Sequence, residues 1–181
     1  MSSLRPTANL QNIALIGFMG TGKTSVGHLL ATSLHLEFVD TDHLIETRTG
    51  KSIPEIFAQD GEPVFRDLEK QLLAELAHRR RLVISCGGGL GANADNLASL
   101  KTHALVVCLW ASAEKIWQRV RHQHHRPLLA DPDPQAKIRT LLAARTPFYR
   151  QADVMVNTDL RSMKAVAQQI AHQFQLVKAG R

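Results

Sequence analysis

Residues 17–24 read Gly-Phe-Met-Gly-Thr-Gly-Lys-Thr, a full match to the phosphate-loop pattern G-x-x-x-x-G-K-[ST]. An apolar run at 13–16 precedes the motif, as a buried strand would, and apolar residues at helical spacing follow it between Val26 and Leu34. Strand, glycine-rich turn and helix is the arrangement in which backbone N–H groups and a helix N-terminus bind polyphosphates. The sequence therefore predicts that residues 17–24 bind a nucleoside triphosphate, rather than forming a turn that matches by chance.

Within this motif, each residue type has a chemical task. The glycines let the backbone curve closely around an anion, because a Cβ would clash there or forbid the required backbone angles. Lys23 supplies a mobile positive charge for the outer phosphates, and the Thr24 hydroxyl can ligate magnesium. The residues expected to bind the nucleotide here are Gly20, Thr21, Gly22, Lys23, Thr24 and Ser25.

Length and composition indicate one domain, covering residues 1–181. With 44% hydrophobic residues, the chain can bury a core without disulfides or metal. No apolar run approaches the ~18 residues of a membrane span, and the polar residues 1–11 do not resemble a secretory signal. Cys86 and Cys108 lie in strand-like stretches, which is typical of reduced thiols in a cytoplasmic protein. We therefore expect a cytoplasmic protein with no membrane partner.

The chain is basic, with a formal net charge of +6 and a pI near 9.7. A nucleic-acid-binding protein concentrates Lys and Arg on one stripe and adds aromatic residues for stacking. Here aromatic residues make up 5%, and the arginines are spread along the chain, with some concentration between Arg119 and Arg150. An enzyme that binds an anionic nucleotide would also be basic in that region. Because the chain lacks the stripe and the aromatic residues, we favour the enzyme and expect no nucleic-acid partner. The arginine run 79–81 is interpreted as a solvated helix end.

Strand-like and helix-like stretches alternate along the chain. Strands are expected at 12–16, 37–39, 82–85, 104–109 and 154–156. One helix is expected to follow the phosphate loop, and a short one to start with Ser52 as its cap and Pro54 just inside it. Further helices are expected at about 42–48, 65–76, 112–121, 135–145 and 161–176. The alternation predicts an α/β fold with a parallel sheet and helices on both faces. Ligands of such sheets lie beyond the carboxyl ends of the strands.

Carboxylates and glycines follow the second and third predicted strands. Asp40 and Asp42 flank Thr41, and a carboxylate at this place can hold magnesium through water or accept a proton from a substrate hydroxyl. The alternative for Asp42 is that it only caps the next helix. Three consecutive glycines favour a close backbone approach to a ligand over a simple turn. They are Gly87, Gly88 and Gly89.

Two arginines each have two interpretations. Arg66 lies at the edge of an apolar helix face with Glu69 three residues on, so it either forms a surface ion pair or binds an anion. Arg145 lies near a helix end, where it either complements the helix dipole or binds a substrate carboxylate.

A polar segment at about 121–134 is expected to be a mobile lid. It is rich in histidine and proline, and it has few apolar anchors besides Leu128 and Leu129. Its arginine, Arg126, is expected to reach the phosphates. The histidines have no spaced partner cluster, so they are interpreted as loop residues and not as metal ligands.

Taken together, these motifs resemble those of the shikimate kinase family. From about Ile13 to Met163 they run in order as G-F-M-G-T-G-K-T, D-T-D, G-E-P-V-F-R, G-G-G, R-P-L-L and R-T-P-F-Y. The phosphate loop is shared by many kinases, whereas the rest of the set is much more specific. The resemblance implies a P-loop nucleoside-monophosphate-kinase-like fold in three layers, with a five-stranded parallel sheet in the order 2-3-1-4-5. It also implies ATP-dependent phosphorylation of the 3-hydroxyl of shikimate, a step toward chorismate and the aromatic amino acids.

The resemblance also implies residue roles, with the substrate-binding region at about 42–78. Lys23 would hold the transferred phosphate and Asp42 would bind the shikimate hydroxyls as the candidate base. Thr24 would bind Mg²⁺ directly, and Asp40 would act on its water shell. Arg66 and Arg145 would bind the substrate carboxylate, and the glycine run would contact the ring hydroxyls. Arg126 would bind the ATP phosphates, and Arg119 and Arg161 would flank the adenine. Cys86 replaces the Thr that the family more often has, and Met163 lies where some members have proline.

Other functions fit part of this pattern. A gluconate kinase, or another small-metabolite kinase of the same fold, would keep the phosphate loop but would not need two arginines for this cyclic carboxylate. A nucleoside-monophosphate kinase is a further alternative. A non-catalytic ATP-binding regulatory module would not need Asp40, Asp42 and Arg126 together. A GTPase is not expected, because the chain has no Asn-Lys-x-Asp segment. We expect a monomer whose ligands are ATP, Mg²⁺ and shikimate.

Overall fold

The computed structural model of the protein describes residues 10–122 and 132–180. Its five parallel strands form one sheet in the order β2-β3-β1-β4-β5, which confirms the expected topology. The strands are β1 (Asn12–Ile16), β2 (Glu37–Asp40), β3 (Leu82–Ser85), β4 (Ala104–Trp110) and β5 (Val154–Asn157). The helices are α1 (Lys23–Leu34), α2 (Thr41–Thr49), α3 (Ile53–Gln59), α4 (Glu62–Leu76), the short 3-10 helix η1 (Leu90–Ala92), α5 (Ala94–His103), α6 (Ala113–Val120), α7 (Pro134–Tyr149) and α8 (Met163–Lys178).

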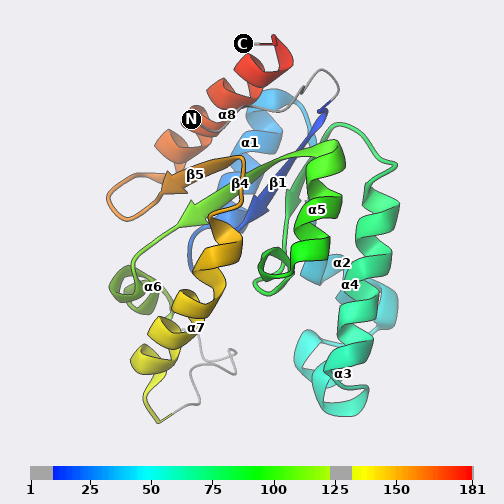
Figure 1. The fold of residues 1–181 in the computed structure, drawn as a ribbon, viewed down its shortest axis with the longest axis vertical. Coiled ribbons are helices and arrows are strands. Elements are labelled where there is room, and N and C mark those ends of the chain that lie inside the picture. The colour runs from blue at the N-terminus through cyan, green and yellow to red at the C-terminus, as the bar shows by residue number, and fades with distance from the viewer. Residues whose placement is uncertain (1–9, 123–131, 181) are drawn as a thin grey trace.

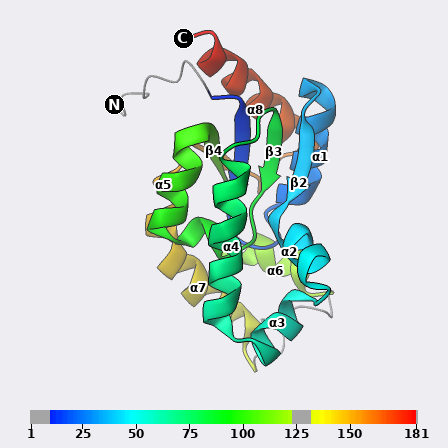
Figure 2. The ribbon, with the colours of Figure 1, turned by 90° about the vertical axis from the view of Figure 1, so that its right-hand side faces the viewer.

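Helices cover both faces of the sheet (Figures 1 and 2). Side chains alternate across a strand, so successive residues of β1 enter different cores. Ile13 and Leu15 pack with residues of α1 and α8. Ala14 and Ile16 belong to the larger cluster on the other face, with residues of α4, α5, α6 and α7. The three-layer α/β architecture is therefore confirmed, and no helix in the described part of the chain is long and apolar enough to cross a membrane.

The carboxyl ends of the strands bring the sequence motifs together. Asp40 at the end of β2 pairs with Ser85 at the end of β3, and Ile16 at the end of β1 pairs with Cys108 of β4. The phosphate loop follows β1, the paired aspartates follow β2 and the glycine run follows β3. Because these strands are neighbours in a parallel sheet, the three motifs meet at one edge.

Helix α5 is absent from the sequence-based expectation. Asn93 caps it, accepting from the Asn96 N–H at 3.0 Å, and Leu97 and Leu100 supply its buried side. Two buried leucines make a much shorter apolar stripe than the one that marks α4. The cap was therefore the main local signal for this helix.

Helix α7 extends past its expected end near Arg145. It continues through Pro147 to Tyr149, which is 1% exposed. Proline removes one backbone N–H donor, but Pro147 lies in the last turn, so only the final two residues of the helix follow it. Packing of the tyrosine thus sets the end of the helix.

The arginine run 79–81 is exposed, as expected, but it lies just beyond the end of a helix and not in its last turn. Helix α4 ends at Leu76. Arg79 pairs with Glu37 at 2.7 Å, and the Arg81 guanidinium donates to the His35 carbonyl at 2.9 Å. The run therefore connects the segment before β3 to the start of β2 and to His35 just before it.

Candidate functional site

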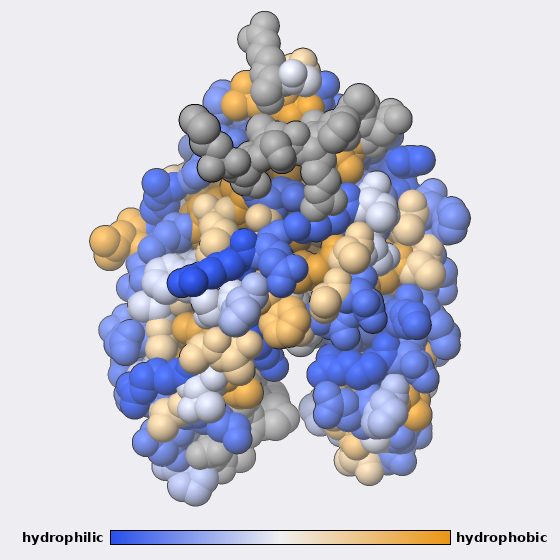
Figure 3. All heavy atoms as spheres, viewed as in Figure 1, coloured by the Kyte–Doolittle hydropathy of each residue, from blue (hydrophilic) through white to orange (hydrophobic). Residues whose placement is uncertain are grey.

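A cavity of about 970 Å³ opens at the carboxyl ends of β1, β2 and β3. In the space-filling view the molecule is notched at its lower edge, between the side that carries α7 and the side that carries α3 and α4 (Figure 3). The predicted site residues that line the cavity are Gly20, Gly22, Lys23, Thr24, Ser25, Asp40, Asp42, Gly87, Gly88 and Arg119. Segments from four parts of the chain therefore share one cavity.

The phosphate loop is held in a curved shape by its own hydrogen bonds. Gly22, with φ of 97°, precedes the first residue of α1 in a backbone region that favours glycine. The Lys23 ammonium donates to the carbonyls of Gly17 and Phe18 at 2.9 and 3.0 Å. The buried Thr21 hydroxyl also donates to the Phe18 carbonyl, at 2.8 Å. The Thr21 side chain thus serves the loop itself, while the start of α1 lies at the cavity.

Asp40 connects the phosphate loop to α2. Its Oδ1 accepts from the backbone N–H groups of Asp42 and His43 at 3.1 and 3.3 Å, so Asp40 is the cap of α2. The alternative that Asp42 is the cap is therefore wrong. The other oxygen of Asp40, Oδ2, accepts from the Thr24 hydroxyl at 3.4 Å. A hydroxyl and a carboxylate this close fit Mg²⁺, which usually takes few protein oxygens and completes its shell with water and phosphate.

Asp42 lies in the first turn of α2, against the bare α-carbon of Gly87. A Cβ on Gly87 would collide with the Asp42 carboxylate. The pKa of Asp42 is raised to about 6, first by burial and then by the negative charges of Asp40 and Glu69, with Lys23 acting in the opposite direction. Such a carboxyl is ionised at neutral pH and is a stronger base than an exposed aspartate.

Arg66 on α4 reaches the last residue of the glycine run, since a Cβ on Gly89 would come within 2.8 Å of its Nη1. The expected ion pair is present, with Nη1 of Arg66 2.7 Å from Glu69, and Nη2 also bonds Glu62 at 2.9 Å. Glu69 is no surface partner, because it is 1% exposed. Its Oε1 is buried and has no hydrogen-bond partner within the described residues, and burial raises the pKa of Glu69 against the effect of Arg66. The sequence showed the spacing of this pair but not its burial, so Glu69 was missed as a site residue.

Arg145 on α7 reaches the same glycine run from the other side. Its Nη1 donates to the Gly88 carbonyl at 2.8 Å, and the hydroxyl of Tyr149, one turn further on, donates to the same oxygen at 3.3 Å. The guanidinium carbon also lies 5.2 Å from the centre of the Phe18 ring. Burial raises the pKa of Tyr149 to about 12, so its hydroxyl stays a donor. Two guanidinium groups and one carboxylate thus surround three glycines.

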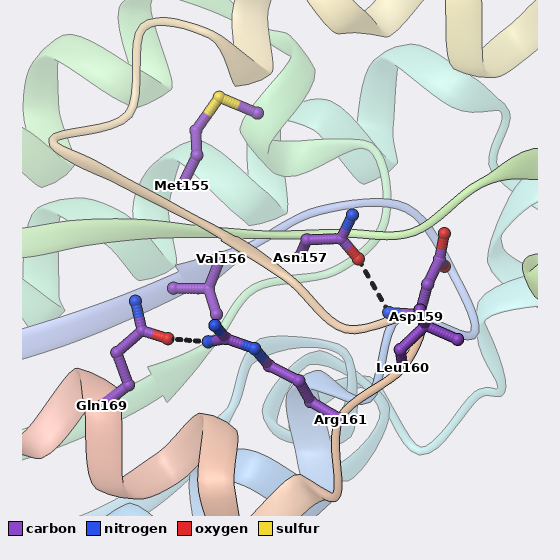
Figure 4. Close-up of a pocket in the computed structure, with 7 residues that line it drawn as sticks. All are labelled: Met155, Val156, Asn157, Asp159, Leu160, Arg161 and Gln169. Atoms are coloured by element: carbon purple, nitrogen blue, oxygen red, sulfur yellow. Dashed lines mark hydrogen bonds between the residues drawn. The ribbon is translucent and has the colours of Figure 1, made fainter.

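Arg119 and Arg161 line different cavities. Arg119 lies at the phosphate loop, where it donates to the Gly20 carbonyl at 3.1 Å and to the hydroxyl and carbonyl of Thr158 at 3.0 and 2.6 Å. Arg161 lines a second cavity of about 550 Å³ at strand β5, where it is hydrogen-bonded to Gln169 (Figure 4). The structure therefore does not bring these two arginines together in one cavity.

The predicted lid at about 121–134 falls largely on residues outside the described part of the chain. Arg126, Leu128 and Leu129 are among them. At the described ends, His122 lines the main cavity and Asp133 caps α7, accepting from the Ala136 N–H at 2.9 Å.

Comparisons with known proteins point to one family. A family model described as shikimate kinase matches residues 19–175. The shikimate kinase of Thermodesulfovibrio yellowstonii is 40% identical over 172 residues, which cover 95% of this chain and 99% of the relative. A shikimate kinase of Thermus thermophilus is 45% identical over 159 residues, covering 87% of this chain and 86% of the relative. A solved shikimate kinase from Acinetobacter baumannii, in complex with shikimate, is 41% identical with a TM-score of 0.86, covering 93% of this chain and 94% of that one.

A gluconokinase from Sinorhizobium meliloti is also similar, with a TM-score of 0.53 at 18% identity. At that identity the likeness is one of fold alone. The shikimate kinases named above differ from it in both respects, since their identities are 40% or more and the solved one has a TM-score of 0.86. The family model spans most of the sequence, including the phosphate-loop lysine, the paired aspartates, and Arg66 and Arg145. The chain therefore belongs to the shikimate kinase family.

Proposed function

We propose that the protein transfers the γ-phosphoryl group of ATP to the 3-hydroxyl of shikimate, giving shikimate 3-phosphate and ADP. The observation that carries the proposal is a single cavity lined by both the phosphate loop and the partly buried Asp42. Phosphoryl transfer needs little more than this, because its catalysis is mostly positioning and electrostatic stabilisation. The substrate pair follows from membership of the family.

On the donor side, Lys23 is the central residue. Its ammonium lies at the start of α1 beside the loop carbonyls, where it neutralises charge on the transferred group together with the helix N-terminus. We assign Mg²⁺ binding to Thr24 and Asp40, and the ion, when bound, neutralises further charge on the donor phosphates. Arg119 is proposed to lie beside the adenine, and Arg126 is proposed to cover the phosphates. Arg161 lines the separate cavity at β5, so it is assigned no part in nucleotide binding.

On the acceptor side, Asp42 accepts the proton of the attacking hydroxyl. The hydroxyl oxygen forms a bond to the γ-phosphorus, and the bond from that phosphorus to the β–γ bridging oxygen breaks. ADP leaves with this electron pair. With its pKa near 6, Asp42 is ionised at neutral pH and ready to take the proton.

The substrate carboxylate is assigned to Arg66 and Arg145. A guanidinium group binds a carboxylate through two parallel hydrogen bonds. Arg66 already pairs with Glu62 and Glu69, whereas Arg145 donates to a neutral carbonyl. A substrate carboxylate would share Arg66 with two other carboxylates, so Arg145 is expected to contribute more of the binding free energy.

The test is ADP release measured by a coupled assay with shikimate, gluconate, AMP and CMP offered separately. Shikimate alone should raise ADP release above the rate without acceptor, and phosphorus NMR should show one new phosphate monoester. Chelating Mg²⁺ should abolish the reaction and added Mg²⁺ should restore it. Equal ADP release with and without shikimate would refute the proposal. We also propose that the protein acts as a cytoplasmic monomer. Light scattering in the presence of both substrates tests the oligomeric state.

A further inference from the structure

Thr41 stands between the two site carboxylates and has no role in the mechanism above. Its side chain is 0% exposed. A buried hydroxyl costs free energy unless it is hydrogen-bonded. Its Oγ1 accepts from the Gly87 N–H at 2.8 Å, a contact between residues 46 positions apart. A buried polar side chain between two site residues therefore binds one backbone group of the glycine run.

This bond replaces a strand contact that the sheet cannot supply. Strands β2 and β3 pair in register as far as Asp40 and Ser85. One residue on, the Cys86 N–H still donates to β1, at 3.0 Å. In a parallel ladder the next N–H, that of Gly87, points back toward β2. There the chain has already turned into α2, and the Thr41 hydroxyl takes the place of the missing carbonyl.

The same bond connects two groups on different helices. Asp42, the neighbour of Thr41, lies against the bare α-carbon of Gly87. The next carbonyl, that of Gly88, accepts from Arg145 of α7 at 2.8 Å. A continuous path of contacts thus runs from the carboxylate of α2, through the glycine backbone, to the guanidinium of α7.

We propose that Thr41 is a positioning residue, whose hydroxyl holds the glycine run where Asp42 and Arg145 act on the same acceptor molecule. The inference rests on the proposed function and extends it. Positioning within the site matters because small displacements of reacting groups cost large factors in rate. The hydroxyl also satisfies a backbone donor that would otherwise be buried without a partner.

The test compares Thr41→Val, which keeps the shape but removes the acceptor, with Thr41→Ser, which keeps the hydroxyl. Thr41→Val should lower kcat/KM for shikimate by about tenfold or more, while the KM for ATP changes by less than about twofold. Thr41→Ser should restore most of the lost kcat/KM. Amide hydrogen exchange at Gly87 should be faster in Thr41→Val than in the wild type or in Thr41→Ser.

A matched control separates positioning from general loss of stability. Ile170 is fully buried in the core on the other face of the sheet, and Ile170→Val should lower the melting temperature while leaving both KM values and kcat unchanged. Wild-type kinetics in Thr41→Val would overturn the inference, and so would a Thr41→Ser variant as impaired as Thr41→Val. If the wild type itself fails to phosphorylate shikimate, the proposed function is refuted instead. The two failures are therefore distinguishable.

Discussion

A single carboxylate, that of Asp42, carries the proton transfer proposed for this site. Its surroundings raise its pKa from 3.8 to about 6. A raised pKa means that the folded protein binds this proton more tightly than the unfolded chain does. The ionised group therefore destabilises the fold above about pH 6, and the destabilisation is relieved as the pH falls from there toward 3.8. Reactivity at this residue is thus coupled to a loss of stability.

The first prediction concerns this coupling. Turnover should fall as the pH drops below about 6, because protonated Asp42 cannot accept the hydroxyl proton. Asp42→Asn keeps the shape and should lower kcat by ~10²–10⁴-fold with ATP affinity close to wild type. At neutral pH its melting temperature should equal or exceed that of the wild type, because the substitution removes a partly desolvated negative charge. Rate profiles against pH and thermal scans measure both effects, and normal turnover in Asp42→Asn would remove its catalytic role.

The second prediction concerns the two arginines at the glycine run. Arg145→Ala should raise the KM for shikimate by roughly 10- to 100-fold, as expected for a charge-assisted hydrogen bond worth ~1.5–3 kcal/mol. Arg66→Ala should raise it less, because Glu62 and Glu69 share that guanidinium. Neither change should alter the KM for ATP. Steady-state kinetics with each substrate varied measures these constants.

The matched control for the arginines is Arg48→Ala. Arg48 of α2 forms an exposed bidentate pair with Glu75 of α4, and neither residue lines the cavity, so both KM values should stay at wild type. Arg145→Lys should also bind shikimate poorly, because an ammonium cannot reproduce a two-point guanidinium contact. If ATP binding weakened and shikimate binding did not, the assignment of both arginines would be wrong.

At the scale of single elements, local patterns predicted most of the molecule. The phosphate loop, the strands and the start of α2 are each set by consecutive residues, so the sequence shows them directly. Contacts across long sequence separations were not predictable in this way. The burial of Glu69 and the bond between Thr41 and Gly87 depend on how β2, β3 and α4 pack. The hydrophobic periodicity of a single segment does not indicate which other segments pack against it.

The third prediction concerns the phosphate loop as a unit. Lys23→Ala removes the charge that we propose binds the phosphates, and two hydrogen bonds within the loop. It should lower turnover by at least ~10²–10³-fold, the usual cost of losing one group that stabilises transition-state charge. Far-UV circular dichroism should be unchanged. The control is Lys70→Ala at an exposed position of α4, which should turn over normally, and near-normal turnover in Lys23→Ala would contradict the kinase proposal.

At the scale of the whole molecule, the sheet separates the site from a second buried polar cluster. At the opposite ends of the strands, the Asn12 side chain accepts from the Leu82 N–H at 3.0 Å and donates to the Arg79 carbonyl at 2.9 Å. Its amide nitrogen also lies 3.2 Å from His103 Nδ1. The other ring nitrogen of His103 is buried and has no hydrogen-bond partner among the residues that the structure describes. This cluster belongs to the fold and not to the chemistry.

The fourth prediction concerns acid stability. Burial lowers the pKa of His103 below its ordinary value of 6.5, and the charge of Arg80 lowers it further. The contribution of the neutral ring to stability is therefore complete above pH 6.5 and is lost as the pH falls toward the lower pKa of the folded state. His103→Gln should reduce the loss of unfolding free energy between about pH 7.5 and about pH 5.

Urea unfolding at the two pH values measures that loss. The control is His172→Gln on the exposed side of α8, which should lose as much unfolding free energy on acidification as the wild type does. An acid loss in His103→Gln equal to that of the wild type would mean that other groups set the acid limit of the fold.

The close approach of Gly87 to Asp42 has a consequence for how this site can vary. A Cβ at Gly87 would occupy the space of the carboxylate, so neither position is free to change alone. In a library of random variants, active members should retain both residues, and any new side chain at position 87 should appear only with a shorter or relocated group at position 42. Attempts to adapt the enzyme to another acceptor would therefore have to vary positions 42 and 87 together.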